Sequence, residues 1–156
     1  MILSWICGII NKKDSERKGD NMVLNLVTLQ QRKNFTYRLK RMLSTKFDLS
    51  DTQIFIFGSF LTDEFMPYES DIDIGVYSEN TTKMYDIKYE LDMYLDKIGL
   101  KHDIVMMQLH PQMWINIPIM IYGKQLTTYE NPTLLEYLLS MVEQWGTDPI
   151  QKLKVV

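Results

Sequence analysis

Residues 54–76 have the sequence IFIFGSFLTDEFMPYESDIDIGV, and this stretch decides the fold of the 156-residue chain. It includes most of a β-branched and aromatic run, residues 53–57, which is typical of a buried strand. It ends at residues 72–76, where apolar side chains alternate with polar or small ones in the period of a second strand. Between the two strands we predict a short helix over residues 59–66, stopped by the proline that follows.

Two pairs of residues in this stretch can carry chemistry. Gly58 and Ser59 lie where the first strand ends and the helix begins, so the backbone can approach a ligand closely and helix-start N–H groups can bind phosphate. Asp71 and Asp73 are separated by one residue, and residues i and i+2 of a strand share a face. Two acids on one face repel each other unless a cation neutralises them, and carboxylate oxygens suit Mg²⁺.

A third acid, Asp103, lies in the next strand that we predict, residues 102–108. If this strand pairs with the strand that carries Asp71 and Asp73, the three carboxylates can hold up to two Mg²⁺ ions. A phosphate cradle beside such a cluster indicates metal-assisted nucleotidyl transfer. His102 points to the opposite face from Asp103, so we assign it a structural role.

The remaining pattern completes an α+β fold, a small mixed β-sheet flanked by helices. Further helices are predicted over residues 22–47, 81–98, 112–122 and 133–145, and a further short strand over residues 125–129. We expect Tyr85 and Tyr89 on the apolar face of the 81–98 helix, and a kink at Pro118.

Charge is distributed unevenly along the chain. Residues 1–47 hold ten lysines and arginines and three acids, whereas the remaining residues hold seven lysines and seventeen acids. The first helix carries many of these cations, Arg32 among them, and we interpret its basic residues as a solvated face or a dock for an acidic partner or RNA. The acidic remainder of the chain offers no evident basic groove, so we do not expect a nucleic-acid substrate.

The chain divides into an N-terminal extension, residues 1–21, which can lie outside the fold, and a single domain, residues 22–156. The apolar run at residues 1–10 is too short to span a bilayer and lacks the features of a secretory signal. A single cysteine, Cys7, excludes an intramolecular disulfide. We therefore expect a cytoplasmic protein without a membrane span.

The order Gly-Ser, Asp-x-Asp and a later strand aspartate resembles the signature of the DNA polymerase beta-like nucleotidyltransferase superfamily. The phrase GSF…ESDIDIGV is most similar to the minimal nucleotidyltransferases, which are often paired with a HEPN-domain ribonuclease as toxin–antitoxin systems. The resemblance covers roughly residues 35–140. One departure is that Asp63 and Glu64 lie where a phosphate-facing cation is common.

The resemblance implies a role for each matched residue. Gly58 and Ser59 would hold the phosphates of ATP, Asp71 and Asp73 would ligate Mg²⁺, and Asp103 would ligate the catalytic metal and help activate the attacking hydroxyl. The reaction would move AMP from ATP to a hydroxyl group of a partner protein, most simply a HEPN-type toxin, and release pyrophosphate.

Two other functions stay open. The chain can be a binding module that keeps the fold but turns over poorly and neutralises its partner by contact. It can also modify a small molecule, as aminoglycoside nucleotidyltransferases do, although few residues follow Asp103 to build an acceptor site. Homo- and hetero-oligomers are both compatible with the sequence.

Overall fold

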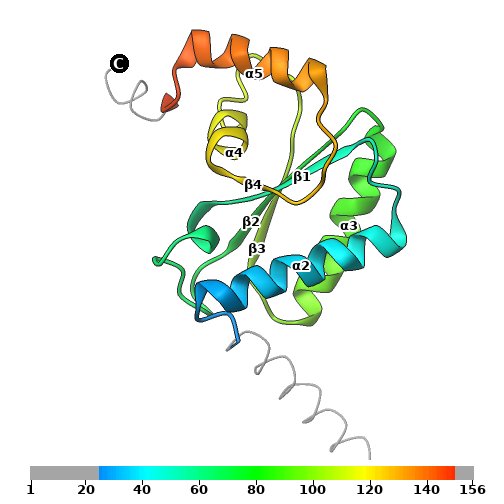
Figure 1. Ribbon diagram of the computed structural model, residues 1–156, viewed down its shortest axis with the longest axis vertical. Coiled ribbons are helices and arrows are strands. Elements are labelled where there is room, and N and C mark those ends of the chain that lie inside the picture. Colours follow the sequence, from blue (N-terminus) through cyan, green and yellow to red (C-terminus); the bar gives the residue numbers. More distant parts are fainter. Residues whose placement is uncertain (1–24, 150–156) are drawn as a thin grey trace, which may run out of the picture.

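The computed structural model describes residues 25–149, which form helices and a small sheet (Figure 1). The helices are α2 (Leu29–Lys46), the 3₁₀ turn η1 (Gly58–Leu61), α3 (Thr81–Lys97), α4 (Asn116–Tyr122) and α5 (Pro132–Trp145). The strands are β1 (Thr52–Phe57), β2 (Ile72–Ser78), β3 (His102–Met106) and β4 (Lys124–Gln125). The α+β class with a small mixed sheet is therefore confirmed.

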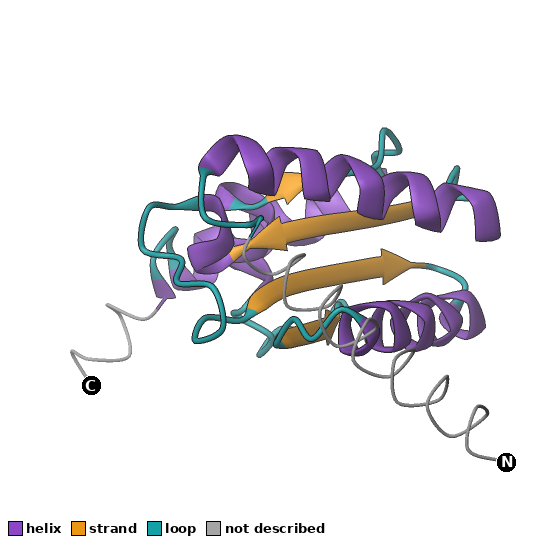
Figure 2. Ribbon diagram, turned by 90° about the horizontal axis from the view of Figure 1, so that it is seen from below, coloured by secondary structure: helices purple, strands orange, loops and turns teal. Residues whose placement is uncertain are grey.

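The four strands lie in the order β3-β2-β1-β4. β1 pairs antiparallel with both β2 and β4, while β2 and β3 are parallel and are joined by α3 as a crossover. The long helices run roughly along the strands rather than across them (Figure 2). Because β1 runs antiparallel to β2 and β2 runs parallel to β3, β1 ends where β2 and β3 begin, and these three strand ends meet at one end of the sheet.

The sheet separates two apolar clusters. On one face, α2 and α3 cover the larger cluster, to which the strands contribute Ile54, Ile74 and Ile104. On the other face, α4 and α5 cover a smaller cluster (Figure 1), which includes Phe55 and Ile119. Alternate strand residues point to opposite faces, so the period-two pattern of the sequence sorts side chains between the clusters.

Local capping explains where the helices begin. Thr28 caps α2 through a capping box, in which its hydroxyl accepts from the Gln31 N–H and its own N–H donates to the Gln31 side chain. Asn131 caps α5, and Pro132 occupies the first helical position, where a missing N–H costs nothing. The predicted start of the first helix at residue 22 is therefore too early within the described part, because this cap fixes the start at Leu29.

Two other predictions about helices are wrong. The 59–66 segment forms only the single turn η1, because Thr62 closes it with an N–H bond to the Ser59 carbonyl and the chain then turns away. Pro118 does not kink a helix, because α4 begins at Asn116 and the proline lies in its first turn, where no intrahelical N–H bond is required.

The buried face of α3 also differs from the prediction. Tyr85 and Tyr89 are mostly exposed, with relative exposures of 55% and 62%. The buried positions are Met84, Ile87, Leu91 and Leu95. These four fit the helical period better, because intervals of three and four residues keep one side of the helix against the sheet.

Between residues 25 and 149, no helix combines the length and apolar character that crossing a bilayer requires. The predicted extension at residues 1–21, together with Cys7, lies outside the described residues.

Candidate active site

The predicted site residues converge at the end of the sheet where β1 ends and β2 and β3 begin. In the parallel pairing of β2 with β3, Asp73 lies directly opposite Asp103. In the antiparallel pairing of β1 with β2, Asp73 also lies opposite Phe57, the residue before Gly58. Asp73 is therefore the centre of the arrangement, between the phosphate-loop candidate on one side and the second carboxylate on the other.

Gly58 lies in contact with the Asp73 side chain. Its φ is +75°, in the left-handed region that glycine tolerates best. A Cβ atom at this position would collide with Oδ2 of Asp73. Glycine is thus required twice at this position, once by the backbone and once by the carboxylate that packs against it.

Ser59 lies at the start of η1 and is half-buried. Its carbonyl accepts two hydrogen bonds from Thr62, one from the backbone N–H at 2.9 Å and one from the hydroxyl at 3.0 Å. The loop after β1 is thus a closed turn, and the first N–H groups of such a turn have no acceptor inside it. These groups are suited to bind an anion.

Burial and the negative charges of two neighbouring acids both act on Asp73. The pKa of Asp73 is raised to about 6, first by burial and then by the negative charges of Asp103 and Asp71. A carboxyl group that stays partly protonated near neutral pH indicates an uncompensated negative site, which a cation would stabilise. This electrostatic coupling supports the prediction that the three acids act together.

Asp71 differs in detail from the prediction. β2 begins at Ile72, so Asp71 lies just before the strand rather than within it, and it is exposed. Asp103 is within β3 and is also exposed. One half-buried carboxylate, Asp73, therefore lies between two that face solvent.

The donor set fits Mg²⁺. Within residues 25–149, no three histidine, cysteine, aspartate or glutamate side chains are already close enough together to hold a metal ion. Mg²⁺ does not need such a cage, because it usually takes one or two carboxylates together with waters and substrate phosphates. Asp73 and Asp103, which are register partners in β2 and β3, supply ligands of this kind, and Asp71 lies just before β2.

The neighbour of Asp103 behaves differently, as predicted. His102 points to the α2–α3 face, where its Nε2 lies 3.0 Å from Oδ1 of Asp92 and its Nδ1 lies 2.9 Å from the Leu100 carbonyl. Although burial acts to raise the pKa of Asp92, hydrogen bonds from Lys88 and His102 hold it below its usual value. His102 ties β3 to α3 and does not face the candidate site.

One residue of this region was missed by the sequence analysis. Arg32, expected on a solvated helix face, is buried at 2% exposure and reaches the loop that follows Ser59. A signal for it was present, because Arg32 lies three and seven residues before the buried Phe35 and Leu39 and so belongs to their stripe.

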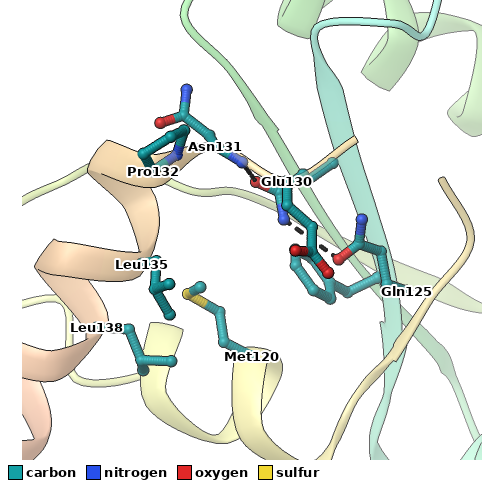
Figure 3. Close-up of a pocket in the computed structure, with 9 residues that line it drawn as sticks. Met120, Gln125, Glu130, Asn131, Pro132, Leu135 and Leu138 are labelled. Carbon is teal, nitrogen blue, oxygen red and sulfur yellow. Dashed lines mark hydrogen bonds between the residues drawn. The ribbon is translucent and has the colours of Figure 1, made fainter. Parts of the chain in front are cut away.

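A pocket of about 330 Å³ lies at the opposite end of β1, between the sheet and α5 (Figure 3). Apolar side chains on one side of it, Met120, Leu135 and Leu138, face polar ones on the other. The polar groups bind one another, since Gln53 donates to Gln125 and accepts from the Asn131 N–H. This pocket is separate from the carboxylates.

Comparison with known proteins agrees with the geometry. The family model described as nucleotidyltransferase domain matches residues 37–123, more than half of the chain, and this range contains all five predicted site residues. No curated protein and no solved structure matches the chain.

Proposed function

Because the chain belongs to the nucleotidyltransferase domain family, we propose that it transfers AMP from ATP to a hydroxyl group of a partner protein. The observation that carries the proposal is the placement of Asp73 between Gly58 and Asp103. A loop suited to phosphate and a cluster of mutually repelling carboxylates share one end of the sheet, which is the arrangement that nucleotidyl transfer requires.

Each residue has a defined task in this proposal. The turn at Gly58 and Ser59 binds the phosphates of ATP through backbone N–H groups and the serine hydroxyl. Asp71, Asp73 and Asp103 would provide the ligands for Mg²⁺, which when bound would supply positive charge that stabilises the phosphates and the departing pyrophosphate. Asp103 accepts the proton of the attacking hydroxyl. The new bond joins that oxygen to the α-phosphorus as the bond to the pyrophosphate oxygen breaks.

A protein acceptor is supported by the openness of the site. Asp71, Asp103 and Gly58 are all exposed, so a hydroxyl on a large partner can approach the carboxylates. The resemblance of GSF…ESDIDIGV to minimal nucleotidyltransferases favours a HEPN-domain toxin as this partner, with the present chain as its antitoxin.

Transfer of label from α-labelled ATP to a HEPN-domain partner, with Mg²⁺ present, tests the proposal. The double variant Asp71→Asn with Asp73→Asn should lower transfer by about a hundredfold or more, since it removes two carboxylates that would hold the charge-stabilising Mg²⁺. The matched control is Glu136→Gln with Glu143→Gln, which removes two exposed acids from α5 and should leave transfer close to the wild-type rate.

Two results would contradict the proposal. One is the absence of transfer by the wild-type chain; the other is equal transfer by the double variant. A double variant that still neutralises a toxic partner would favour the contact-only binding module, because neutralisation would then not need the carboxylates. Transfer to a small hydroxylated compound but not to protein would favour the small-molecule alternative.

A further inference from the structure

Arg32 connects two segments that are distant in sequence. Its Nε donates to the Phe60 carbonyl at 2.9 Å, and its Nη2 donates to the Thr62 carbonyl at 2.7 Å. Its Nη1 donates to the carbonyls of Leu26 and Val27, at 3.1 and 2.9 Å. The guanidinium thus joins the chain just before α2 to the chain just after Ser59.

The charge of Arg32 is unusually placed. Arg32 lies in the first turns of α2, where the helix dipole disfavours a cation, and it forms no ion pair with any carboxylate of residues 25–149. Burying a charge is costly unless its hydrogen bonds are satisfied. Four backbone carbonyls provide that satisfaction, and the rings of Phe60 and Phe65 lie 6.0 and 5.3 Å from the guanidinium carbon.

These contacts hold the peptide groups of the loop in place. In a trans peptide the C=O and the N–H lie in one plane, so a hydrogen bond that holds the carbonyl oxygen also restrains the N–H of the same unit. Arg32 restrains the units that begin at Phe60 and Thr62, and Thr62 itself closes the turn by donating its N–H and its hydroxyl to the Ser59 carbonyl. The turn is then ordered before any ligand arrives, and binding does not have to order it.

We propose that Arg32 is a positioning residue, whose guanidinium holds the Gly58-Ser59 turn in the conformation that receives the nucleotide's phosphates. This inference rests on the proposed function of that turn. The planar guanidinium with its several N–H donors contributes more to holding the turn than the positive charge does. A lysine ammonium has the charge, but it is a single point that cannot span carbonyls on two separate segments.

The test compares Arg32→Lys and Arg32→Met with the control Arg38→Met, which removes an exposed arginine from the same helix. Amide hydrogen exchange reports the order of the loop, and titration with MgATP reports binding. In both Arg32 variants, exchange at residues 58–63 should accelerate about tenfold or more while β1 and β2 stay protected. The dissociation constant for MgATP should rise by a similar factor, whereas Arg38→Met should change neither quantity.

Several outcomes would overturn the inference. Unchanged exchange in the loop, or exchange that accelerates equally throughout the sheet, would show that Arg32 does not act on the loop specifically. Normal MgATP binding despite a loosened loop would show that the order of the turn is irrelevant to the nucleotide. If Arg32→Lys kept wild-type loop exchange and wild-type MgATP binding, the effect would be due to the positive charge rather than to the planar guanidinium. If the wild-type chain does not bind MgATP, the proposed function itself fails, which is distinct from failure of an Arg32 variant alone.

Discussion

The two faces of the sheet serve different purposes. Among residues 25–149, the face under α2 and α3 carries a cluster of nineteen buried apolar residues, whereas the cluster under α4 and α5 has five. All three candidate carboxylates are at the end of the sheet, and Asp73 and Asp103 point to the side of the smaller cluster. The large core can fix the strands firmly, so the smaller face can tolerate carboxylates that repel one another. The larger stabilising core and the side chains of Asp73 and Asp103 thus lie on opposite faces of the same sheet.

The largest effect on folding should come from the α2–α3 face. Phe35→Ala removes a ring that packs edge-on against Phe60 and stacks with Tyr94, and it should lower the free energy of unfolding by about 3–5 kcal/mol. Tyr37→Ala, on the exposed side of the same helix, should change it by less than about 0.5 kcal/mol. Urea denaturation measures both. Equal losses would show that Phe35 does not stabilise the larger cluster as its burial implies.

A smaller loss of stability, with a large loss of activity, is expected at the site. Gly58→Ala places a side chain at positive φ and against the Asp73 carboxylate, and should cost about 1–3 kcal/mol of folding free energy. Gly99→Ala is the matched control, because Gly99 has a φ of +74° but open space around its Cβ position. Both variants are strained, yet only Gly58→Ala should abolish nucleotidyl transfer. Retained transfer in Gly58→Ala would remove that turn from the proposed site.

The burial of Asp73, followed by repulsion from Asp103 and Asp71, should give the metal-free protein a characteristic pH dependence. The pKa of Asp73 is raised to about 6 from an unfolded value of 3.8, so the folded state binds the proton more tightly. The stabilisation is present in full below pH 3.8 and is lost as the pH rises towards and through 6.

Asp73→Asn should remove the loss of folding stability that occurs as the pH rises through 6. Asp63→Asn, a control in an exposed loop, should show the same loss as the wild type. Denaturation midpoints measured from pH 4 to pH 7.5 without divalent ions provide the comparison. If wild type and Asp73→Asn show the same slope, Asp73 does not have the raised pKa that its burial and its acidic neighbours impose.

The smallest effect on the free energy of unfolding should come from an exposed ion pair between α2 and α3. Lys46 on α2 forms an ion pair with Glu90 on α3, and the lysine side chain is 48% exposed. Lys46→Ala should lower the free energy of unfolding by less than about 1 kcal/mol, and added salt should weaken the difference. A larger, salt-independent loss would show that this pair contributes to the core more than its exposure implies.

Much of the site was predictable because it depends on short-range rules. Alternation in residues 72–76 places Asp73 opposite in direction to Ile72, and the Gly58-Ser59 pair lies at the end of an evident strand. Arg32 was not recognised, because a cation on an amphipathic helix usually faces solvent. Its four acceptors come from residues 26, 27, 60 and 62, and no local pattern brings these carbonyls together.

The sequence by itself determined the α+β class and the order of strands and helices along the chain, and it selected the candidate carboxylates and the candidate glycine turn, because these follow from periodicity, turn chemistry and motif spacing. Only the tertiary structure decided that Asp73 lies opposite Asp103, that a Cβ at Gly58 would meet that carboxylate, and that Arg32 points inward. These depend on strand register and on which carbonyls are left facing the core. Both are set by packing between segments that are far apart in the chain.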